Sequence, residues 1–554
     1  MTERNAQNPP EELGATTAYL LEEVRKMNIP YLRFRDSSLI LLGYGSRQRK
    51  LRTAVVGSTS AIGMEIAGDK EETKQLLADA LIPTPRGFLV YDEAELRRAF
   101  DRTRLPVVTK PLDGNHGRGV TTHIDTFEKA LAGFRTAKKI SGAVIVEEFL
   151  EGDDHRFLVI DFKLVAVAKR TPAMVTGNGF STIAALIDEE NLNPQRGHGP
   201  EHVLAPIETD EVTLRMLSEK DLSPGSVPAS GETVFLKDTA NISAGGTSTD
   251  VTDCVHPDNV FLAERVARLF DLDICGIDIV TTDVSVPLTE SKGGIIEVNA
   301  GPGLRMHTNP TVGRPRNVAA PILEMLFPEG ISRIPIVGTN RTNDDNLTVR
   351  LLTKLAEQKG YRVGRTESSG AYVTDRKVSD IDGTTPECGR IVLFDPLVDF
   401  AVLTCGHGAE PASRFAFDAC NIGIIHTLDH PQYETAISLI HKIPPAGYAI
   451  LDADDHRTFS MVHEMPCRYA FIGTEKEDEF LLRQGHGERT ALLFKNGAAT
   501  LYSKDIQTVL FSLGDIRFTP DRVQLKALLS TALAAFILGF GLETIREVFR
   551  NHKI

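Results

Sequence analysis

The sequence has 554 residues, which exceeds the size of a single hydrophobic core and predicts two to four domains. Its hydrophobic fraction of 42% and charged fraction of 25% are typical of a soluble globular protein. The net charge of −14 argues against general binding to nucleic acid or to anionic membranes, because both need a basic surface.

The beginning of the sequence, MTERNAQNPPEELG, is polar and has no secretory pattern. The most apolar stretch, residues 532–542, is shorter than the roughly 20 residues that span a bilayer, so we expect a buried helix there. The six cysteines are scattered and form no C-x-x-C pair, which favours reduced thiols in a cytoplasmic protein.

The first 330 residues predict one α/β unit that follows a short N-terminal segment. Residues 1–65 are expected to form strand–turn units that pack on residues 66–330. Residues 191–230 are polar and proline-rich, which predicts a surface insertion. Apolar periodicity predicts helices at residues 69–80, 93–100, 127–136 and 259–270, and buried strands at 105–110, 142–150, 276–281 and 293–299.

A second α/β unit is predicted from residue 331 to residue 554. Near residue 334 the pattern resets to a strand, a glycine turn and a helix, IPIVGTN followed by LTVRLLTKLAEQKG. Apolar strands are expected at residues 401–404, 422–425 and 448–452, and final helices at 524–540 and 542–549. The chain is therefore expected to be an α/β protein of several domains.

A buried strand in the first unit ends in Lys110 and is followed by a glycine-rich loop. Glycines let backbone N–H groups approach phosphate oxygens, and a lysine adds a mobile positive charge. An ordinary tight turn is the alternative. The loop residues that we assign to nucleotide binding are Gly114, Asn115, His116, Gly117 and Gly119.

Two further features complete the expected site. The strand AVIVEEFL ends in Glu147, Glu148, Phe149 and Leu150, which are expected to support adenine and ribose, although the two glutamates are alternatively solvated charges. Asp278 and Glu297 lie in strands expected to be adjacent, and Asn299 shares the face of Glu297. Such oxygen ligands suit Mg²⁺; ion pairs with lysines or arginines are the alternative.

In this order the three features resemble the ATP-grasp superfamily of carboxylate–amine ligases. The resemblance implies an acyl-phosphate mechanism, with ATP and Mg²⁺ as cofactors. It assigns Lys70 and Lys110 to the nucleotide phosphates, and Asp278, Glu297 and Asn299 to the metal.

Longer strings, including KPLDGNHGRGV, EGDDHRFLVI, NISAGGTSTDVTD and EVNAGPGLRMH, resemble the cyanophycin synthetase family over nearly the whole chain. That resemblance implies extension of an aspartate-backbone polymer used for nitrogen storage. Arginines suit carboxylates, although ion pairs within the chain are the alternative. His307 has a structural alternative as well. The residues implied on the substrate side are Arg156, Arg170, Asn241, Ser243, Gly245, Gly246, Arg305 and His307.

The second unit resembles the Mur-ligase-like half of that family, in a degenerate form. Where the family has GTNGKT, this chain reads Gly338-Thr339-Asn340-Arg341-Thr342, so the phosphate-binding lysine is missing. Thr404 stands where the family places a metal-binding glutamate. We also expect that the C-terminal Mur lobe and most of the usual N-terminal domain are absent.

This pattern resembles the shorter second class of cyanophycin synthetase, which polymerises β-aspartyl dipeptides such as β-aspartyl-arginine with one ATP-grasp site. The expected partners are therefore a dipeptide and a polymer, with no nucleic acid and no membrane, in a cytoplasmic homo-oligomer. Two alternatives remain: a ligase that adds free aspartate or makes a short peptide, and a catalytically silent scaffold for a synthetase or its polymer.

Overall fold

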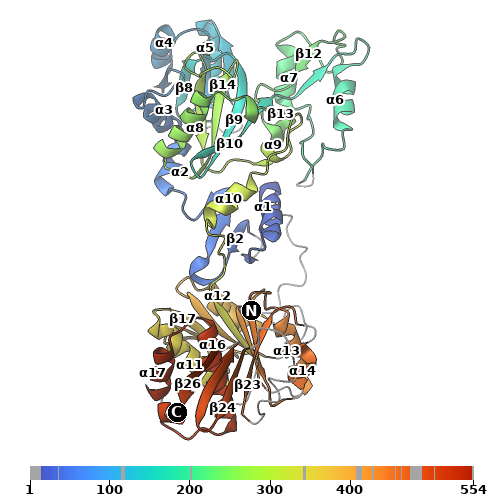
Figure 1. Cartoon of the computed structure of the whole chain (residues 1–554). Coiled ribbons are helices and arrows are strands. Elements are labelled where there is room, and N and C mark those ends of the chain that lie inside the picture. Colours follow the sequence, from blue (N-terminus) through green and yellow to red (C-terminus); the bar gives the residue numbers. More distant parts are fainter. Residues whose placement is uncertain are drawn as a thin grey trace. The chain divides into compact units, whose positions relative to one another are not determined.

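The computed structural model describes residues 14–34, 37–113, 119–199, 202–340, 345–406, 415–426, 430–455, 457–462, 465–474, 490–503 and 506–551. The chain forms two compact units that divide at Gly330 and Ile331 (Figure 1). The first unit also contains most of the N-terminal segment, whereas residues 29–31 and 42–48 group with the second unit. The expectation of an α/β protein of several domains is confirmed. Within the described residues, no helix is both long enough and apolar enough to cross a bilayer.

The N-terminal segment contains one helix that the sequence analysis did not predict. Helix α1 (Ala15–Lys26) buries Thr17, Leu20, Leu21 and Val24, which recur at the spacing of one helical face. The strand–turn units after it form a four-stranded sheet in the order β1-β2-β3-β4 (Tyr31–Arg33, Leu39–Leu42, Arg49–Arg52 and Val55–Val56).

Two further sheets of the first unit, a smaller and a larger one, are joined by the chain around residue 150. The smaller sheet has the order β5-β8-β6-β7 (Gly87–Val90, Val144–Glu148, Val107–Pro111 and Thr121–Ile124). Helices α4 (Glu93–Arg102) and α5 (Phe127–Lys138) supply the buried side chains that pack against Val107, Val144 and Val146 on one face of this sheet. Helices α2 (Ala61–Gly68) and α3 (Lys70–Asp79) precede it in the chain.

The larger sheet of the first unit has the order β13-β10-β9-β14-β15 (Thr247–Asp250, Lys163–Thr171, Asp153–Ile160, Ile274–Thr281 and Gly294–Asn299). Its strands are antiparallel neighbours, and side chains alternate between two faces. Helix α8 (Pro257–Leu269) packs its buried residues with Phe157, Ile277 and Val298 on one face. The opposite face therefore carries Arg156, Asp278 and Glu297.

Residues 173–236 form a small substructure with its own core. It consists of the strand pair β11-β12 (Met174–Thr176 and Thr233–Phe235) and helices α6 (Ile183–Asn191) and α7 (Glu211–Ser218). The stretch 191–230, predicted as a surface insertion, contains α7 and gives Ile207 and Leu217 to this core. Helices α9 (Arg305–Thr308) and α10 (Ala319–Leu326) follow the larger sheet.

The second unit is built on an eleven-stranded sheet in the order β19-β18-β17-β20-β16-β21-β22-β23-β24-β25-β26. The central strands are parallel and buried, and the two ends of the sheet are antiparallel hairpins. The strands are β16 Ile336–Asn340, β17 Val363–Glu367, β18 Gly370–Val373, β19 Arg376–Ser379, β20 Phe400–Cys405, β21 Ile422–Ile425, β22 Tyr448–Asp452, β23 Arg468–Gly473, β24 Thr490–Lys495, β25 Ala498–Ser503 and β26 Ile506–Ser512.

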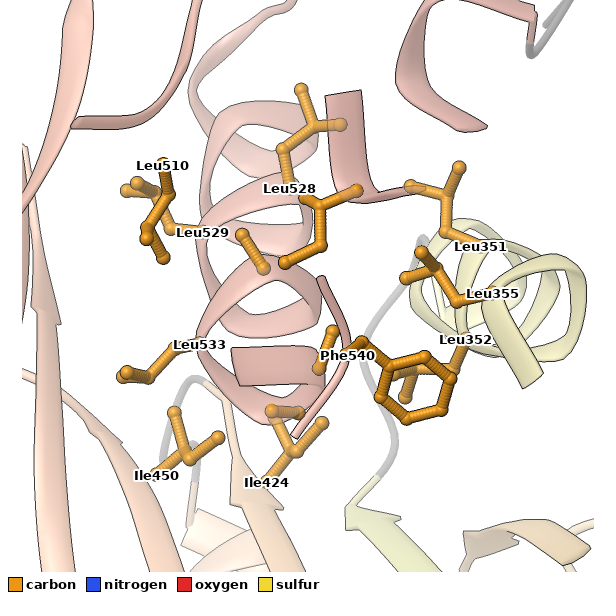
Figure 2. Packing of buried hydrophobic residues seen from close by; sticks show 14 of the residues in the cluster. Leu351, Leu352, Leu355, Ile424, Ile450, Leu510, Leu528, Leu529, Leu533 and Phe540 are labelled. Carbon is orange, nitrogen blue, oxygen red and sulfur yellow. The ribbon is translucent and has the colours of Figure 1, made fainter. Parts of the chain in front are cut away.

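In the described part of the second unit, this sheet is covered by helices α11 (Asp345–Gln358), α12 (Pro386–Phe394), α13 (His430–Ile440), α16 (Arg522–Ile537) and α17 (Leu542–Asn551); α14 (Arg457–Val462) is shorter. Figure 2 shows the α11 leucines beside Phe540 and Leu533 of α16 near Ile450; these residues and Ile424 belong to one buried cluster. Of the apolar stretch 532–542, predicted as a buried helix, residues 532–537 lie in α16 and residues 532–535 are buried, whereas Phe536 is 38% exposed and the helix ends at Ile537.

Candidate active site

A lysine cluster lies on the face of the smaller sheet opposite its helices. Along β6 the side chains alternate, so Val107 enters the core and Lys110 points to the other face. Glu147 of the neighbouring strand β8 shares that face. Its two carboxylate oxygens contact Lys110 Nζ at 2.6 Å and Lys74 Nζ at 2.5 Å. Glu147 is therefore a buried ion-pair partner of two lysines and not a solvated charge at a strand end.

Helix α3 supplies Lys70 and Lys74, one helical turn apart. Burial lowers the pKa of Lys74, and Lys110 lowers it further while Glu147 opposes the change. Burial would raise the pKa of Glu147, but Lys110 and Lys74 outweigh it, so this pKa lies below its usual value. The glutamate is therefore ionised at neutral pH and holds both lysines in place.

Lys70 links this cluster to the larger sheet. Burial lowers its pKa, and the charges acting on it are those of Lys110, Glu297, Asp113 and Glu147. Glu297 lies on β15, far from Lys110 in the sequence. Positive side chains from α3 and β6 and a carboxylate from β15 thus converge in one region of the first unit.

The glycine-rich loop connects β6 to β7, which pair as antiparallel neighbours. Gly114, Asn115, His116 and Gly117 lie outside the described residues. Gly119 is described and has a positive φ of 75°.

The segment after Glu147 leads from the smaller sheet to the larger one. The backbone N–H groups of Glu148 and Phe149 donate to the carbonyls of Arg86 and Pro106, each at 2.9 Å. Leu150 packs against Gly294, and Glu148, Phe149 and Leu150 are all half-buried. The residues predicted to support adenine and ribose therefore form a fixed connection with partly exposed side chains.

A row of charged side chains crosses the face of the larger sheet opposite helix α8, and Arg156 and Asp278 in this row are buried. Arg156 on β9 lies directly opposite Asp278 on β14, and Asp278 lies directly opposite Glu297 on β15. Asn299 lies opposite Gly276 in the next pair of that face. The strand register therefore brings together the three predicted metal ligands, as expected from the sequence.

Both carboxylate oxygens of Asp278 are engaged by arginines. Arg156 donates to it through Nε and, at 3.1 Å, through Nη2, and Arg170 Nη2 lies 3.2 Å from Oδ2. Burial would raise the pKa of Asp278, but the two arginines outweigh it and lower the pKa. The alternative raised from the sequence, pairing with arginines, is thus the arrangement found for Asp278.

Gly276 is required beside this pair, because a Cβ there would lie 2.8 Å from Pro302 and 2.9 Å from the Arg156 side chain.

Asp278, Glu297 and Asn299 offer the oxygen ligands that a hard cation prefers, since two carboxylates and one carboxamide lie on neighbouring strand positions. A cation bound there shares Asp278 with Arg156 and Arg170. Elsewhere among the described residues, no group of three or more histidine, cysteine, aspartate or glutamate side chains forms a metal site.

His307 and Arg305 lie on the short helix α9. His307 is buried, and burial followed by the charge of Arg156 lowers its pKa to about 3. Its Nε2 atom has no hydrogen-bond partner within the described part of the protein. Arg305 is half-buried and borders a cavity. His307 is therefore neutral near neutral pH, so it is not a cationic substrate ligand.

The predicted substrate loop, Asn241 to Thr247, is held by its own backbone and by a residue that the sequence analysis missed. Gly246 N donates to Asn241 O, and buried Arg196 donates to the carbonyl of Gly245 at 2.9 Å. Gly245 has a positive φ of 89° and lies against Ile207, whereas Ser243 is exposed.

Lys74 is the second residue that the sequence analysis missed. The spacing of four residues between Lys70 and Lys74 in the predicted helix could have identified it, because residues one helical turn apart share a helix face.

In the second unit, Thr404 makes two structural hydrogen bonds. Its hydroxyl donates to Thr366 O at 2.9 Å, and its N–H donates to Thr366 Oγ1 at 2.8 Å. The Thr404 hydroxyl therefore forms a hydrogen bond between strands β20 and β17. Gly338, Thr339 and Asn340 end strand β16, and Arg341 and Thr342 lie outside the described residues.

Residues 67–177 match the family described as the RimK-like ATP-grasp domain. The chain is 38% identical over 558 aligned residues to a cyanophycin synthetase of Nostoc sp. (strain PCC 7120 / SAG 25.82 / UTEX 2576), covering 98% of this chain and 62% of that protein. It is 33% identical to the glutathione biosynthesis bifunctional protein GshAB of Clostridium perfringens (strain 13 / Type A), over 57% of this chain and 41% of that one. The chain thus spans less than two thirds of the length of these relatives.

Among solved structures, the bifunctional glutathione synthetase from Pasteurella multocida is 29% identical to this chain. The alignment covers 57% of this chain and 44% of that one, with a TM-score of 0.46.

Proposed function

We propose, from the relationship of this chain to cyanophycin synthetases over 98% of its length, that it is an ATP-dependent carboxylate–amine ligase. Its product is an aspartate-backbone polymer built from β-aspartyl dipeptides, such as β-aspartyl-arginine. One observation carries the proposal: the charges of Lys110 on β6 and of Glu297 on β15 both act on Lys70 of α3. This convergence supports the proposed roles of the two lysines in phosphate binding and of Glu297 in metal binding.

The reaction has two steps. A carboxylate oxygen at the growing end attacks the γ-phosphorus of ATP, and the bond to the β-phosphate oxygen breaks with its electron pair leaving on ADP. The amine of the next dipeptide then attacks the acyl carbon and forms the amide bond. The bond between the acyl carbon and the phosphate oxygen breaks, and its electron pair leaves with phosphate. The nitrogen loses its proton to phosphate or solvent.

The lysines stabilise the first step. Charge on the transferred phosphoryl group is spread over its oxygens, and fixed positive groups in a site of low water content reduce the barrier. Lys110 and Lys70 supply those charges, and Glu147 with Lys74 keeps Lys110 in position. We propose that the loop from Gly114 to Gly119 covers the phosphates and that residues 147–150 hold adenine and ribose.

We propose Mg²⁺ as the metal of Asp278, Glu297 and Asn299, where it neutralises phosphate charge when bound. Arg156 and Arg170 are proposed to bind substrate carboxylates, because both already hold the carboxylate of Asp278. His307 is too weak a base to remove the amine proton at neutral pH. A hydrogen bond from His307 that orients the substrate fits its neutral state better.

We propose that residues 331–554 serve as a scaffold without ATP hydrolysis. The missing lysine of the phosphate loop and the hydrogen-bonded Thr404 support this. A cytoplasmic homo-oligomer remains our proposal for the assembled protein. Addition of free aspartate is the alternative function at the same site.

Phosphate release from ATP in the presence of a primer tests the proposal. We expect stimulation by β-aspartyl-arginine or β-aspartyl-lysine and none by free aspartate. Stimulation by free aspartate alone favours the alternative ligase, and no stimulation by any substrate favours a silent scaffold. Incorporation of free arginine contradicts the scaffold role of the second unit.

Two variants locate the activity. Lys110→Ala and Glu297→Gln are each expected to lower turnover about 100-fold or more, since the first removes a positive charge proposed to stabilise the phosphoryl group and the second removes a carboxylate proposed to hold the metal. Lys129→Ala, which removes an exposed lysine paired with Asp125, is the matched control and should retain activity. Full turnover in Lys110→Ala or Glu297→Gln would remove the proposed site.

A further inference from the structure

His123 lies at an irregularity of strand β7 in the smaller sheet. Strands β6 and β7 pair Val107 with Ile124 and Thr109 with Thr121, and their register shifts between these two pairs. One residue of β6 therefore lies opposite two residues of β7, one of which is His123. Such a β-bulge re-aims a side chain, and bulges are common at sheet edges and next to active sites. The bulge thus takes the His123 side chain out of the regular alternation of its strand.

The backbone of His123 has the left-handed conformation, with a φ of 55°. Residues other than glycine adopt this conformation at a cost in free energy, although histidine is found there more often than most. The side chain is exposed, so burial does not offset the strain. Its Nδ1 atom lies 3.2 Å from the hydroxyl oxygen of its neighbour Thr122, which is a local contact. Strained residues of this kind cluster at functional sites.

The ring of His123 lies against the ring of Phe149. The two ring centroids are 4.0 Å apart, and the ring planes are inclined at 43°. Aromatic pairs commonly have centroids about 4.5–7 Å apart, so these two rings are in full contact. Phe149 belongs to the connection that leads from the smaller sheet to the larger one. His123 therefore packs on the segment to which we assign the nucleotide base.

Phe149 is held in two ways. Its backbone N–H donates to Pro106 O at 2.9 Å, but this bond does not set the torsion angles of the side chain. The ring is half-buried, and His123 covers part of it. Without the imidazole ring, Phe149 gains rotamers that a ligand has to reduce again when it binds. The contact with His123 therefore preorganises the Phe149 ring.

We infer that His123 is a positioning residue for an adenine nucleotide and acts through its contact with Phe149. The imidazole ring keeps Phe149 in the conformation that receives the base, and the bulge of β7 supplies the geometry of the contact. The inference rests on the ligase function proposed above, which assigns residues 147–150 to adenine and ribose. It gives a role to a residue that the sequence analysis assigned to no site.

Nucleotide binding to the full chain tests the inference without turnover. The probe is the non-hydrolysable ATP analogue AMP-PNP with Mg²⁺, measured by titration calorimetry. His123→Gly removes the ring and suits a positive φ. We expect it to weaken AMP-PNP binding about three- to tenfold, as for the loss of one aromatic pair, without lowering the urea midpoint. A purely structural role would give the opposite result, normal binding with lower stability.

His123→Phe is the reciprocal variant, because phenylalanine keeps an aromatic ring but tolerates a positive φ poorly. AMP-PNP affinity should stay within about twofold while the urea midpoint falls. A loss of affinity equal to that of His123→Gly contradicts a role of the ring.

The matched control is Asp271→Gly, which also places glycine at an exposed position of the first unit with a φ of 53°. This substitution removes no aromatic ring. It should change AMP-PNP binding less than about twofold.

Phe149→Leu shows whether His123 acts through Phe149. Leucine keeps an apolar side chain and removes the partner ring. In this background, His123→Gly should weaken AMP-PNP binding by less than about twofold further, because two residues in contact lose their shared interaction only once.

The inference is overturned if His123→Gly binds AMP-PNP normally, if Asp271→Gly weakens binding equally, or if the effects of His123→Gly and Phe149→Leu add fully. Tighter binding by His123→Gly also overturns it, because the imidazole ring would then occupy the place of the base. No binding by the unchanged chain removes the nucleotide site itself.

These outcomes differ from failure of the ligase function. AMP-PNP binding that depends on His123, without peptide-dependent ATP turnover, keeps the inference and removes the ligase. Normal turnover with an unchanged KM for ATP in His123→Gly keeps the ligase and removes the inference.

Discussion

Replacing Glu147 by glutamine tests whether its negative charge stabilises the two lysines that it contacts, Lys74 and Lys110. Glu147 is 4% exposed and contacts Lys110 and Lys74 at 2.6 and 2.5 Å. Glutamine keeps the shape of the side chain and removes its charge. The variant therefore leaves two largely buried lysines without the anion that compensates them.

The expected cost is large. Removing one partner of a buried ion pair costs about 3–5 kcal/mol, because the remaining charge stays desolvated. The side chains of Lys74 and Lys110 are 13% and 14% exposed, so solvent screens them little. Since a domain is typically stable by only about 5–15 kcal/mol, Glu147→Gln should remove roughly a fifth or more of the stability of the first unit.

The effect depends on pH with a definite sign. The folded pKa of Glu147 lies below its ordinary 4.5, so its stabilisation is fully present above pH 4.5 and is lost as the pH falls through the lower folded value. In the variant, the folded pKa of Lys74 falls further below its ordinary 10.5, because the opposing effect of Glu147 is gone. Between the lowered folded pKa of Lys74 and its ordinary pKa of 10.5, Lys74 binds more protons in the unfolded chain than in the folded one. The free energy of unfolding of the variant therefore increases as the pH rises through this range.

Urea denaturation followed by far-UV circular dichroism measures the change, because the chain has no tryptophan. Hydrogen exchange at residues 70–79 and 144–148 assigns the loss to the first unit. The matched control is Glu148→Gln, which removes the same charge from a half-buried neighbour and should change stability by less than about 0.5 kcal/mol. Equal effects of the two substitutions, or no effect of Glu147→Gln, would refute the reasoning.

Two further predictions concern His307 and Thr404. The folded pKa of His307 is about 3, below its ordinary 6.5, so the unfolded state binds a proton first and stability falls as the pH drops below 6.5; the loss at pH 4.5 is about 2–3 kcal/mol. His307→Gln should make the urea midpoint less sensitive to pH between 7 and 4.5, and an unchanged pH dependence would contradict the buried neutral histidine. Thr404→Val should destabilise the second unit by about 1–3 kcal/mol, because Thr366 O loses a buried donor. It should leave phosphate release unchanged, and a large loss of turnover at full stability would assign Thr404 to catalysis.

Apolar patterns predicted four strands of the first unit, β6, β8, β14 and β15. Strand β14 (Ile274–Thr281), for example, is a short and mostly apolar run, which is typical of a buried strand. The structure buries almost all of its residues. The grouping of Asp278, Glu297 and Asn299 followed from the same pattern, since neighbouring strands place alternate residues on one face.

The partners of these side chains were not predictable in the same way. Arg156 reaches Asp278 only because β9 and β14 are neighbours in a fixed register, and the sequence does not determine strand order. The burial of Glu147 was not predictable for a similar reason, because it depends on α3, which supplies Lys74. Helix α1 and the core contributions of residues 191–230 were missed because short apolar spacings are hidden among polar residues and prolines.

The two units differ in how their charges balance, and this difference supports placing the nucleotide chemistry in the first. At the carboxyl ends of parallel strands, where ligands of such sheets commonly bind, the second unit has Asp452 on β22. Lys526 contacts it at 2.5 Å and also lies 3.3 Å from Asp454, so a cation of the chain itself balances these carboxylates. In the first unit, the buried Glu147 pairs with two lysines, Lys74 and Lys110, so two positive charges face one negative charge in that ion pair. We propose that a nucleotide phosphate binds beside these lysines, whereas Lys526 already lies between two carboxylates of the second unit.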